Sequence, residues 1–259
     1  MQAGTFGAFG LLELAADLAQ QGAVGAATDA LDRAARLDDV GLVATACRAL
    51  ADELTRGGPK RPTTDELQAA FSAGGSALHD GRRPEALDRF LFVVTHDPRA
   101  ARAWFGVGCA HRNTVEATEA AAETSVDATT GPVLALLVRP YGTIAQDAYI
   151  GMVYAAEAFR IAIALEPTLS LATDALVWAE LWLGRSEQGL RLATDAAERQ
   201  PGDSNAVATL AVALLVCGHA DEARQAAEAA VGLEPAHSTA LETIAIAEAL
   251  ARAATDPVR

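Results

Sequence analysis

The chain has 259 residues and a formal net charge of −14, and 51% of its residues are hydrophobic whereas only 5% are aromatic. An acidic chain repels phosphate backbones and anionic lipid surfaces, so we expect neither nucleic acid nor a membrane as its ligand. The three cysteines, Cys47, Cys109 and Cys217, lack metal-ligand or redox spacing, which fits a reduced, cytoplasmic setting.

The N-terminal 57 residues predict three helices. Leucines recur at helical spacing up to Gly22, which ends the first helix. Residues 24–37 supply the second helix of a hairpin, and residues 40–55 supply a third helix with its own apolar stripe. We therefore expect residues 1–57 to form an N-terminal helical section, which is a degenerate repeat plus an extra helix.

The segment 57–62 interrupts this pattern, because its two glycines and two prolines cannot continue a helix. Thr63 or Thr64 then stands where an N-cap is expected. Asp65 and Glu66 follow in the first turn, where the helix dipole favours acidic side chains. A second array of helices is predicted to begin here.

Three prolines organise the rest of the chain. Pro167, Pro201 and Pro235 follow one another at intervals of 34 residues, and two of them close a Leu-Glu-Pro tripeptide. Self-similarity at this period is typical of stacked helical hairpins. Proline ends the second helix of each pair and turns the chain into the next pair.

Other residues keep the same phase. Glycine stands at place 8 of two units (Gly74, Gly108), and alanine stands at place 20 of three (Ala86, Ala155, Ala223). Trp104 stands at place 4, Phe90 and Phe159 stand at place 24, and Pro98 stands at place 32. This pattern resembles the tetratricopeptide repeat family. The resemblance implies an all-α, right-handed superhelical solenoid of antiparallel helix pairs. The resemblance covers residues 65–254. The last helix of the predicted array, 238–254, is expected to cap it.

The stretch 113–148 departs from the repeat. Ala120 and Pro132 keep the phase of a divergent helix pair. Pro140 and Gly142, however, fall where the next first helix should run. We interpret the stretch as an insertion between two helices, with a divergent repeat as the alternative.

The resemblance implies that a ligand lies on the concave surface, which the first helix of each repeat builds. The residues that it places there are Phe71, His79, Arg102, Phe105, Arg112, Asn113, Trp178, Leu181, Trp182, Val212, Leu215 and Val216. The C-terminal half of this groove is apolar and needs a cover, which is either the chain's own hexad 133–138, a second copy in a homodimer, or a partner's apolar helix. At the other end, the two arginines and His79 either bind a carboxylate or an acidic peptide or are simply solvated.

No motif predicts a catalytic residue, a cofactor or a metal site. In Cys109-Ala110-His111 and Cys217-Gly218-His219 the two ligand types are two residues apart, and such residues on a helix point to different faces. No phosphate-binding glycine loop and no His-Glu-x-x-His motif occurs.

By family resemblance we therefore expect a non-enzymatic protein–protein interaction module, namely an adaptor, assembly factor or regulatory subunit that binds a partner segment in the groove. One alternative is a homo-oligomeric structural protein with the groove as its interface. The other is a small-molecule sensor or enzyme whose pocket the insertion covers.

Overall fold

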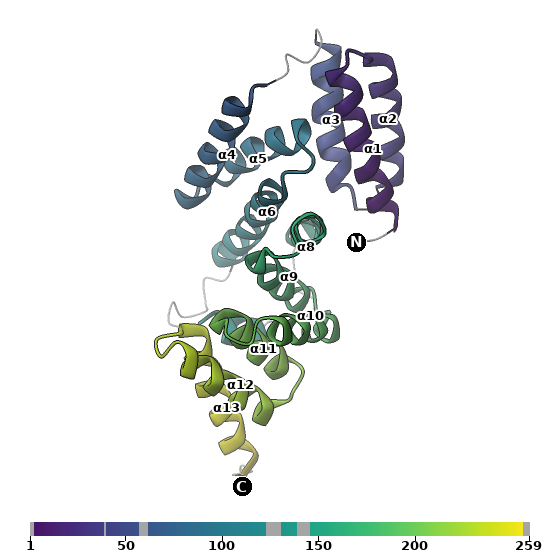
Figure 1. The fold of residues 1–259 in the computed structure, drawn as a ribbon. Coiled ribbons are helices and arrows are strands. Elements are labelled where there is room, and N and C mark those ends of the chain that lie inside the picture. The colour runs from purple at the N-terminus through teal and green to yellow at the C-terminus, as the bar shows by residue number, and fades with distance from the viewer. Residues whose placement is uncertain (1–2, 39, 57–61, 123–130, 139–145, 256–259) are drawn as a thin grey trace. The chain divides into compact units, whose positions relative to one another are not determined.

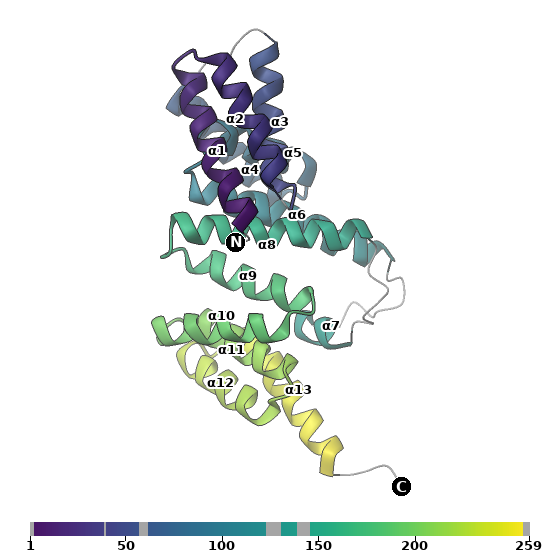
Figure 2. The same ribbon diagram turned by 90° about the vertical axis from the view of Figure 1, so that its right-hand side faces the viewer.

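The computed structural model describes residues 3–38, 40–56, 62–122, 131–138 and 146–255. Within these ranges the chain forms thirteen α-helices and no β-strand (Figure 1, Figure 2). The predicted all-α class is confirmed.

The chain folds into two compact units. Unit 1 comprises Met1–Thr118 and Ile150–Leu169, and unit 2 comprises Glu119–Tyr149 and Ser170–Arg259. The predicted boundary near residue 57 lies within unit 1.

Unit 1 opens with three helices, α1 (Ala3–Gln20), α2 (Val24–Leu37) and α3 (Leu42–Thr55). The first two form a hairpin, and α3 packs against both. Leu12, Leu31 and Leu50, one from each helix, are almost fully buried among them. The apolar stripes predicted for the second and third helices are buried. In α1 the spacing predicted the helix but not its buried face, because Leu14 is 47% exposed whereas Leu12 is buried.

The second part of unit 1 contains the hairpin of α4 (Thr64–His79) and α5 (Arg83–His96), followed by residues of α6 (Ala101–Ala122) and α8 (Gln146–Leu165). Thr63 caps α4, since its hydroxyl accepts a hydrogen bond from the Glu66 N–H at 3.2 Å. The Glu66 carboxylate in turn accepts one from the Thr63 N–H at 2.7 Å. This reciprocal pair is a capping box, and it explains why the helix begins at the predicted place.

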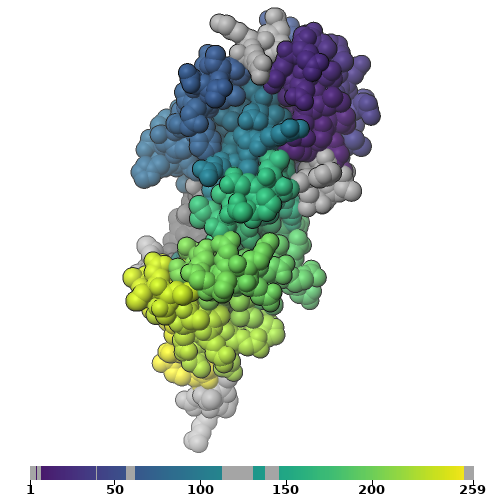
Figure 3. Space-filling model, in the orientation of Figure 1, coloured from purple at the N-terminus to yellow at the C-terminus, as the bar shows by residue number. Residues whose placement is uncertain are grey.

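Unit 2 is a stack of helices: α9 (Ser170–Trp182), α10 (Ser186–Arg199), α11 (Ser204–Val216), α12 (Ala220–Leu233) and α13 (Ser238–Thr255), with the short α7 (Pro132–Val138) beside them. Each helix from α9 to α13 packs on the next, and α11 also contacts both α9 and α13. Ala211 of α11 and Ala227 of α12 are fully buried in an alanine layer. Small side chains let the backbones approach closely. Figure 3 shows the atoms of this part of the chain in continuous contact.

Pro98, Pro167, Pro201 and Pro235 occupy equivalent corners. Each is the second residue of a four-residue turn between two helices. In each turn the last N–H donates to the carbonyl three residues earlier, at 3.0 to 3.1 Å. The interval of 34 residues therefore corresponds to a structural repeat.

The turns between α9 and α10 and between α11 and α12 depend on glycine. Gly184 and Gly218 have φ angles of 76° and 86°, in the left-handed region that side chains disfavour. The N–H of the next residue bonds back to the preceding helix, from Arg185 to the Glu180 carbonyl and from His219 to the Leu214 carbonyl, both at 2.9 Å. This arrangement satisfies carbonyls that the helix end would leave unpaired.

A glycine faces an aromatic ring in two hairpins of unit 1. A Cβ atom at Gly74 would come within 2.9 Å of Phe90, and one at Gly108 within 2.4 Å of Phe159. The first pair is 16 residues apart and the second is 51 residues apart, so 35 additional residues separate the second pair. Thus α6 and α8 form one hairpin, and α7 lies between them in the chain.

α8 is long and apolar enough to cross a membrane, judged by length and composition alone. Half of its most apolar window is buried inside the structure. A core helix has the same composition, so this single helix is weak evidence for a membrane span.

Candidate functional site

Six of the predicted groove residues lie around one apolar cluster in unit 2. Three of them are buried in the cluster, namely Leu181, Val212 and Leu215. The other three are partly buried and packed against it, namely Trp178, Trp182 and Val216. They come from α9 and α11, the first helices of two successive pairs. Ala247 brings α13 into the same cluster.

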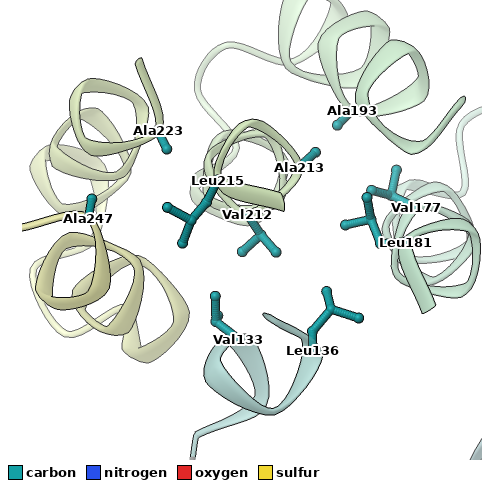
Figure 4. Packing of buried hydrophobic residues seen from close by; sticks show 10 residues of the cluster. All are labelled: Val133, Leu136, Val177, Leu181, Ala193, Val212, Ala213, Leu215, Ala223 and Ala247. Carbon is teal, nitrogen blue, oxygen red and sulfur yellow. The ribbon is translucent and has the colours of Figure 1, made fainter. Parts of the chain in front are cut away.

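The cover of this cluster is α7. Val133 is 0% exposed and Leu136 is 9% exposed, and both belong to the cluster. Figure 4 shows the two side chains directed toward Val212 and Leu215 of α11 and Leu181 of α9. Of the three covers considered from the sequence, the structure contains the chain's own segment. We call the surface of α9, α11 and α13 beneath α7 the α7 groove.

The opposite side of α7 faces outward. Leu134 is 38% exposed, whereas Val133 and Leu136 are buried. Side chains three residues apart lie on the same face of a helix. The groove therefore holds a helical segment by two apolar side chains at that spacing.

A carboxylate from α13 holds the start of α7. The Leu134 N–H donates a hydrogen bond to Oε1 of Glu242 at 3.0 Å. The same carboxylate lies where a side chain at Gly131 would be, because a Cβ atom there would come within 2.3 Å of Oε1. Glu242 thus accepts from an amide that the short helix cannot pair internally.

Sequence reasoning did not find Glu242 or Gly131. The hexad 133–138 was noted as a possible cover, but nothing near Glu242 marks it among the other acids of the chain. One signal was present in Gly131-Pro132, since proline is favoured at the first position of a helix and the preceding glycine has no side chain to cap it. A cap from elsewhere in the fold could have been expected.

A half-buried acid, Asp174, lies on α9. Desolvation by burial, assisted by the negative charge of Asp203, raises the pKa of the Asp174 carboxyl to about 6. Since both causes penalise the ionised form, this carboxyl is protonated more readily than an exposed aspartate.

The aromatic residues predicted for the N-terminal end of the groove contribute to hairpin packing in unit 1. Phe71 lies edge-on to Phe90, with ring centroids 5.7 Å apart. Phe105 lies 5.7 Å from Phe159. Both Phe71 and Phe105 are half-buried, so part of each ring remains accessible.

The polar residues predicted for that end are less closely grouped. His79 is exposed in the last turn of α4, and Arg112 is half-buried. Arg102 has an exposed side chain 3.8 Å from Glu166, and such surface pairs contribute little energy. The side chain of Asn113 lies outside the described residues. The structure therefore gathers the apolar half of the predicted groove into one cluster.

Two groups in unit 1, the half-buried His111 and the buried Cys47, have strongly shifted pKa values. Burial lowers the pKa of His111 to about 4, and the ring lies edge-on to Tyr154, with centroids 5.3 Å apart. Burial, with a smaller effect of Asp38, raises the pKa of the Cys47 thiol to about 12. His111 is thus a neutral packing residue at pH 7, and Cys47 is a protonated thiol. Within the described ranges, no group of three or more His, Cys, Asp or Glu residues could hold a metal ion.

Unit 1 also contains a cavity of about 590 Å³ between α1, α3, α4 and α5. Several polar groups in its wall already have partners. Thr63 takes part in the capping box, and His96 bonds through Nε2 to the Glu53 carboxylate at 2.8 Å and through Nδ1 to the Phe92 carbonyl at 2.9 Å. The bond between His96 and Glu53 joins α5 to α3.

The repeated hairpins with equivalent proline corners define an all-α helical-repeat fold. No family model matches the chain. No curated protein matches it either.

Among solved structures, the chain is similar to MamA AMB-1, with 19% identity over 71% of this chain and 88% of that one, at a TM-score of 0.48. It is also similar to MamA MSR-1, with 18% identity, 74% and 90% coverage, and a TM-score of 0.46. A third similar structure is the P58(IPK) TPR domain, with 13% identity, 96% and 80% coverage, and a TM-score of 0.34. At such values these likenesses carry no conclusion about function, and the repeat class rests on the hairpins and corners described above.

Proposed function

We propose that the chain is a non-enzymatic protein-interaction module, an adaptor, assembly factor or regulatory subunit whose α7 groove binds a short apolar helix of a partner protein. The observation that carries this proposal is the packing of α7, which places Val133 and Leu136 in the buried cluster of unit 2. We place it in a reducing, cytoplasmic setting, because its three cysteines lack metal-ligand or redox spacing.

The shape of the present occupant argues for a helical ligand. α7 has only seven residues, and a helix of that length is not stable alone in water. Its helical form therefore depends on its contacts with the groove. Recognition of an amphipathic helix by apolar anchors at this spacing is a common mode of peptide binding.

The apolar area that α7 buries is small enough for a partner helix to replace α7 in the groove. Burying a valine or a leucine side chain contributes roughly 1.5–3 kcal/mol each, and α7 buries only Val133 and Leu136 fully or nearly so. A partner helix with more apolar anchors would gain more from the same surface. Trp178 and Trp182, which are partly buried and packed against the cluster, offer additional area to such a ligand.

The experiment uses the full chain and a fluorescent peptide with the sequence of residues 131–138 followed by two lysines for solubility. Leu136→Asp places a charge in the apolar cluster and should release α7. Leu134→Asp makes the same change on the exposed side of α7 and is the matched control. We expect the peptide to bind the Leu136→Asp chain at least tenfold more tightly than the unmodified chain, because a tethered competitor acts at a high effective concentration.

Circular dichroism and thermal unfolding would show that each variant is folded, and Leu136→Ala is a milder second variant with the same expected direction. Equal peptide affinity for all chains, or binding to none of the folded chains, would overturn the proposal. A Leu136→Asp chain that binds no peptide but dimerises on sizing over a dilution series would instead favour the homo-oligomer.

A further inference from the structure

The start of α7 lacks the usual capping side chain. Gly131 precedes the first helical residue, Pro132, and the Leu134 N–H is the amide that a side chain at residue 131 would normally accept from. Glycine has no such side chain, and Pro132 has no N–H to be satisfied. Glu242 on α13 accepts from the Leu134 N–H instead, at 3.0 Å.

The glycine and the glutamate occupy one space. A Cβ atom at residue 131 would lie 2.3 Å from Oε1, 2.4 Å from Cδ and 2.6 Å from Oε2 of Glu242. The backbone at Gly131 does not have the positive φ that would itself require glycine. The observation that distinguishes glycine here is therefore the approach of the carboxylate, which is the end of a flexible side chain. Any side chain at this position would push the carboxylate away from the amide that it caps.

Resting on the proposed function, we propose that Glu242 is the specificity-determining residue of the α7 groove. It selects an apolar helix of a partner protein that has glycine immediately before its first turn. It also sets the direction of that helix, because a carboxylate is attracted to the N-terminus of a helix and repelled by its C-terminal carbonyls. The matching ligand carries apolar side chains at its second and fifth helical residues, as Val133 and Leu136 do in α7.

The test uses the full chain with Leu136→Asp, which opens the groove, with and without Glu242→Ala. Two peptides are compared by fluorescence anisotropy, one with the sequence of residues 131–138 and one in which alanine replaces the glycine. With Glu242 present, we expect the glycine peptide to bind at least fivefold more tightly than the alanine peptide. With Glu242→Ala, this preference should shrink at least threefold, because no carboxylate then competes for the space.

Glu248→Ala is the matched control, since Glu248 is an exposed glutamate on the same helix. It should leave the preference unchanged. If both peptides bind and the preference is the same with and without Glu242, the role of Glu242 is overturned while the proposed function stands. If neither peptide binds any folded chain, the proposed function fails and this inference fails with it.

Discussion

The ring of Phe159 on α8 lies against the backbone of Gly108 on α6, so closely that a Cβ atom at residue 108 would come within 2.4 Å of the ring. Gly74 and Phe90 have the same relationship in the preceding hairpin, at 2.9 Å. Gly74 and Gly108 hold the same place in the repeat, as do Phe90 and Phe159, so α6 and α8 correspond to α4 and α5. They also make glycine a packing requirement at these places.

Replacing Gly108 by alanine should destabilise the chain. The added methyl group must displace a buried ring, and overpacking of this kind costs about 1–3 kcal/mol. The control is Gly75→Ala on α4, where a Cβ atom would meet nothing within 4 Å. Alanine is favoured over glycine inside a helix by about 0.5–1 kcal/mol, so the control should stabilise. Urea denaturation measures both changes, and the same sign for the two would contradict this account of the packing.

The stability of the chain should depend on the protonation of Asp174. Its folded pKa of about 6 lies above the ordinary value of 3.8. A raised carboxyl pKa favours the folded state fully below the unfolded pKa, and this contribution is lost as the pH rises through the folded pKa. The Asp174→Asn variant does not titrate. Relative to the original chain, it should therefore gain stability between about pH 4 and pH 7, by roughly 1–3 kcal/mol.

Chemical denaturation at several pH values measures this difference. The exposed Asp195→Asn on α10 is the control and should change the free energy of unfolding by less than about 0.5 kcal/mol at every pH. A stability difference between Asp174→Asn and the original chain that does not vary with pH would show that the folded pKa is not raised.

A chain without residues 114–148 should still fold. This deletion removes the 35 residues by which the hairpin of α6 and α8 exceeds the hairpin of α4 and α5. In the shortened chain, Ile150 falls seven residues after Gly108, as Gly81 falls seven after Gly74. Gly81 has a φ angle of 73°, so the deletion should be combined with Ile150→Gly.

The shortened chain lacks α7, and its groove should be open. We expect the helix content per residue to be retained in circular dichroism. The peptide of residues 131–138 should bind the shortened chain at least as tightly as it binds the Leu136→Asp chain. A shortened chain that remains unfolded even with excess peptide would show that the segment is needed for folding itself.

Much of the fold could be predicted because its signals are local. A proline ends a helix through its own ring and missing N–H, and Thr63 caps a helix through a residue three positions away. The period of 34 residues repeats these short-range signals, so the corners at Pro201 and Pro235 followed from counting. The apolar groove positions on α9 and α11 followed from the same phase.

The sequence by itself determined the hairpins, their corners and the apolar faces of α9 and α11, since each depends on residues that are neighbours in the chain. Only the tertiary structure decided what covers that face. The bond between Leu134 and Glu242 joins residues 108 positions apart, and no periodic pattern connects them. Gly131 and Glu242 are complementary in space, and that fit arises only when α7 and α13 are packed together.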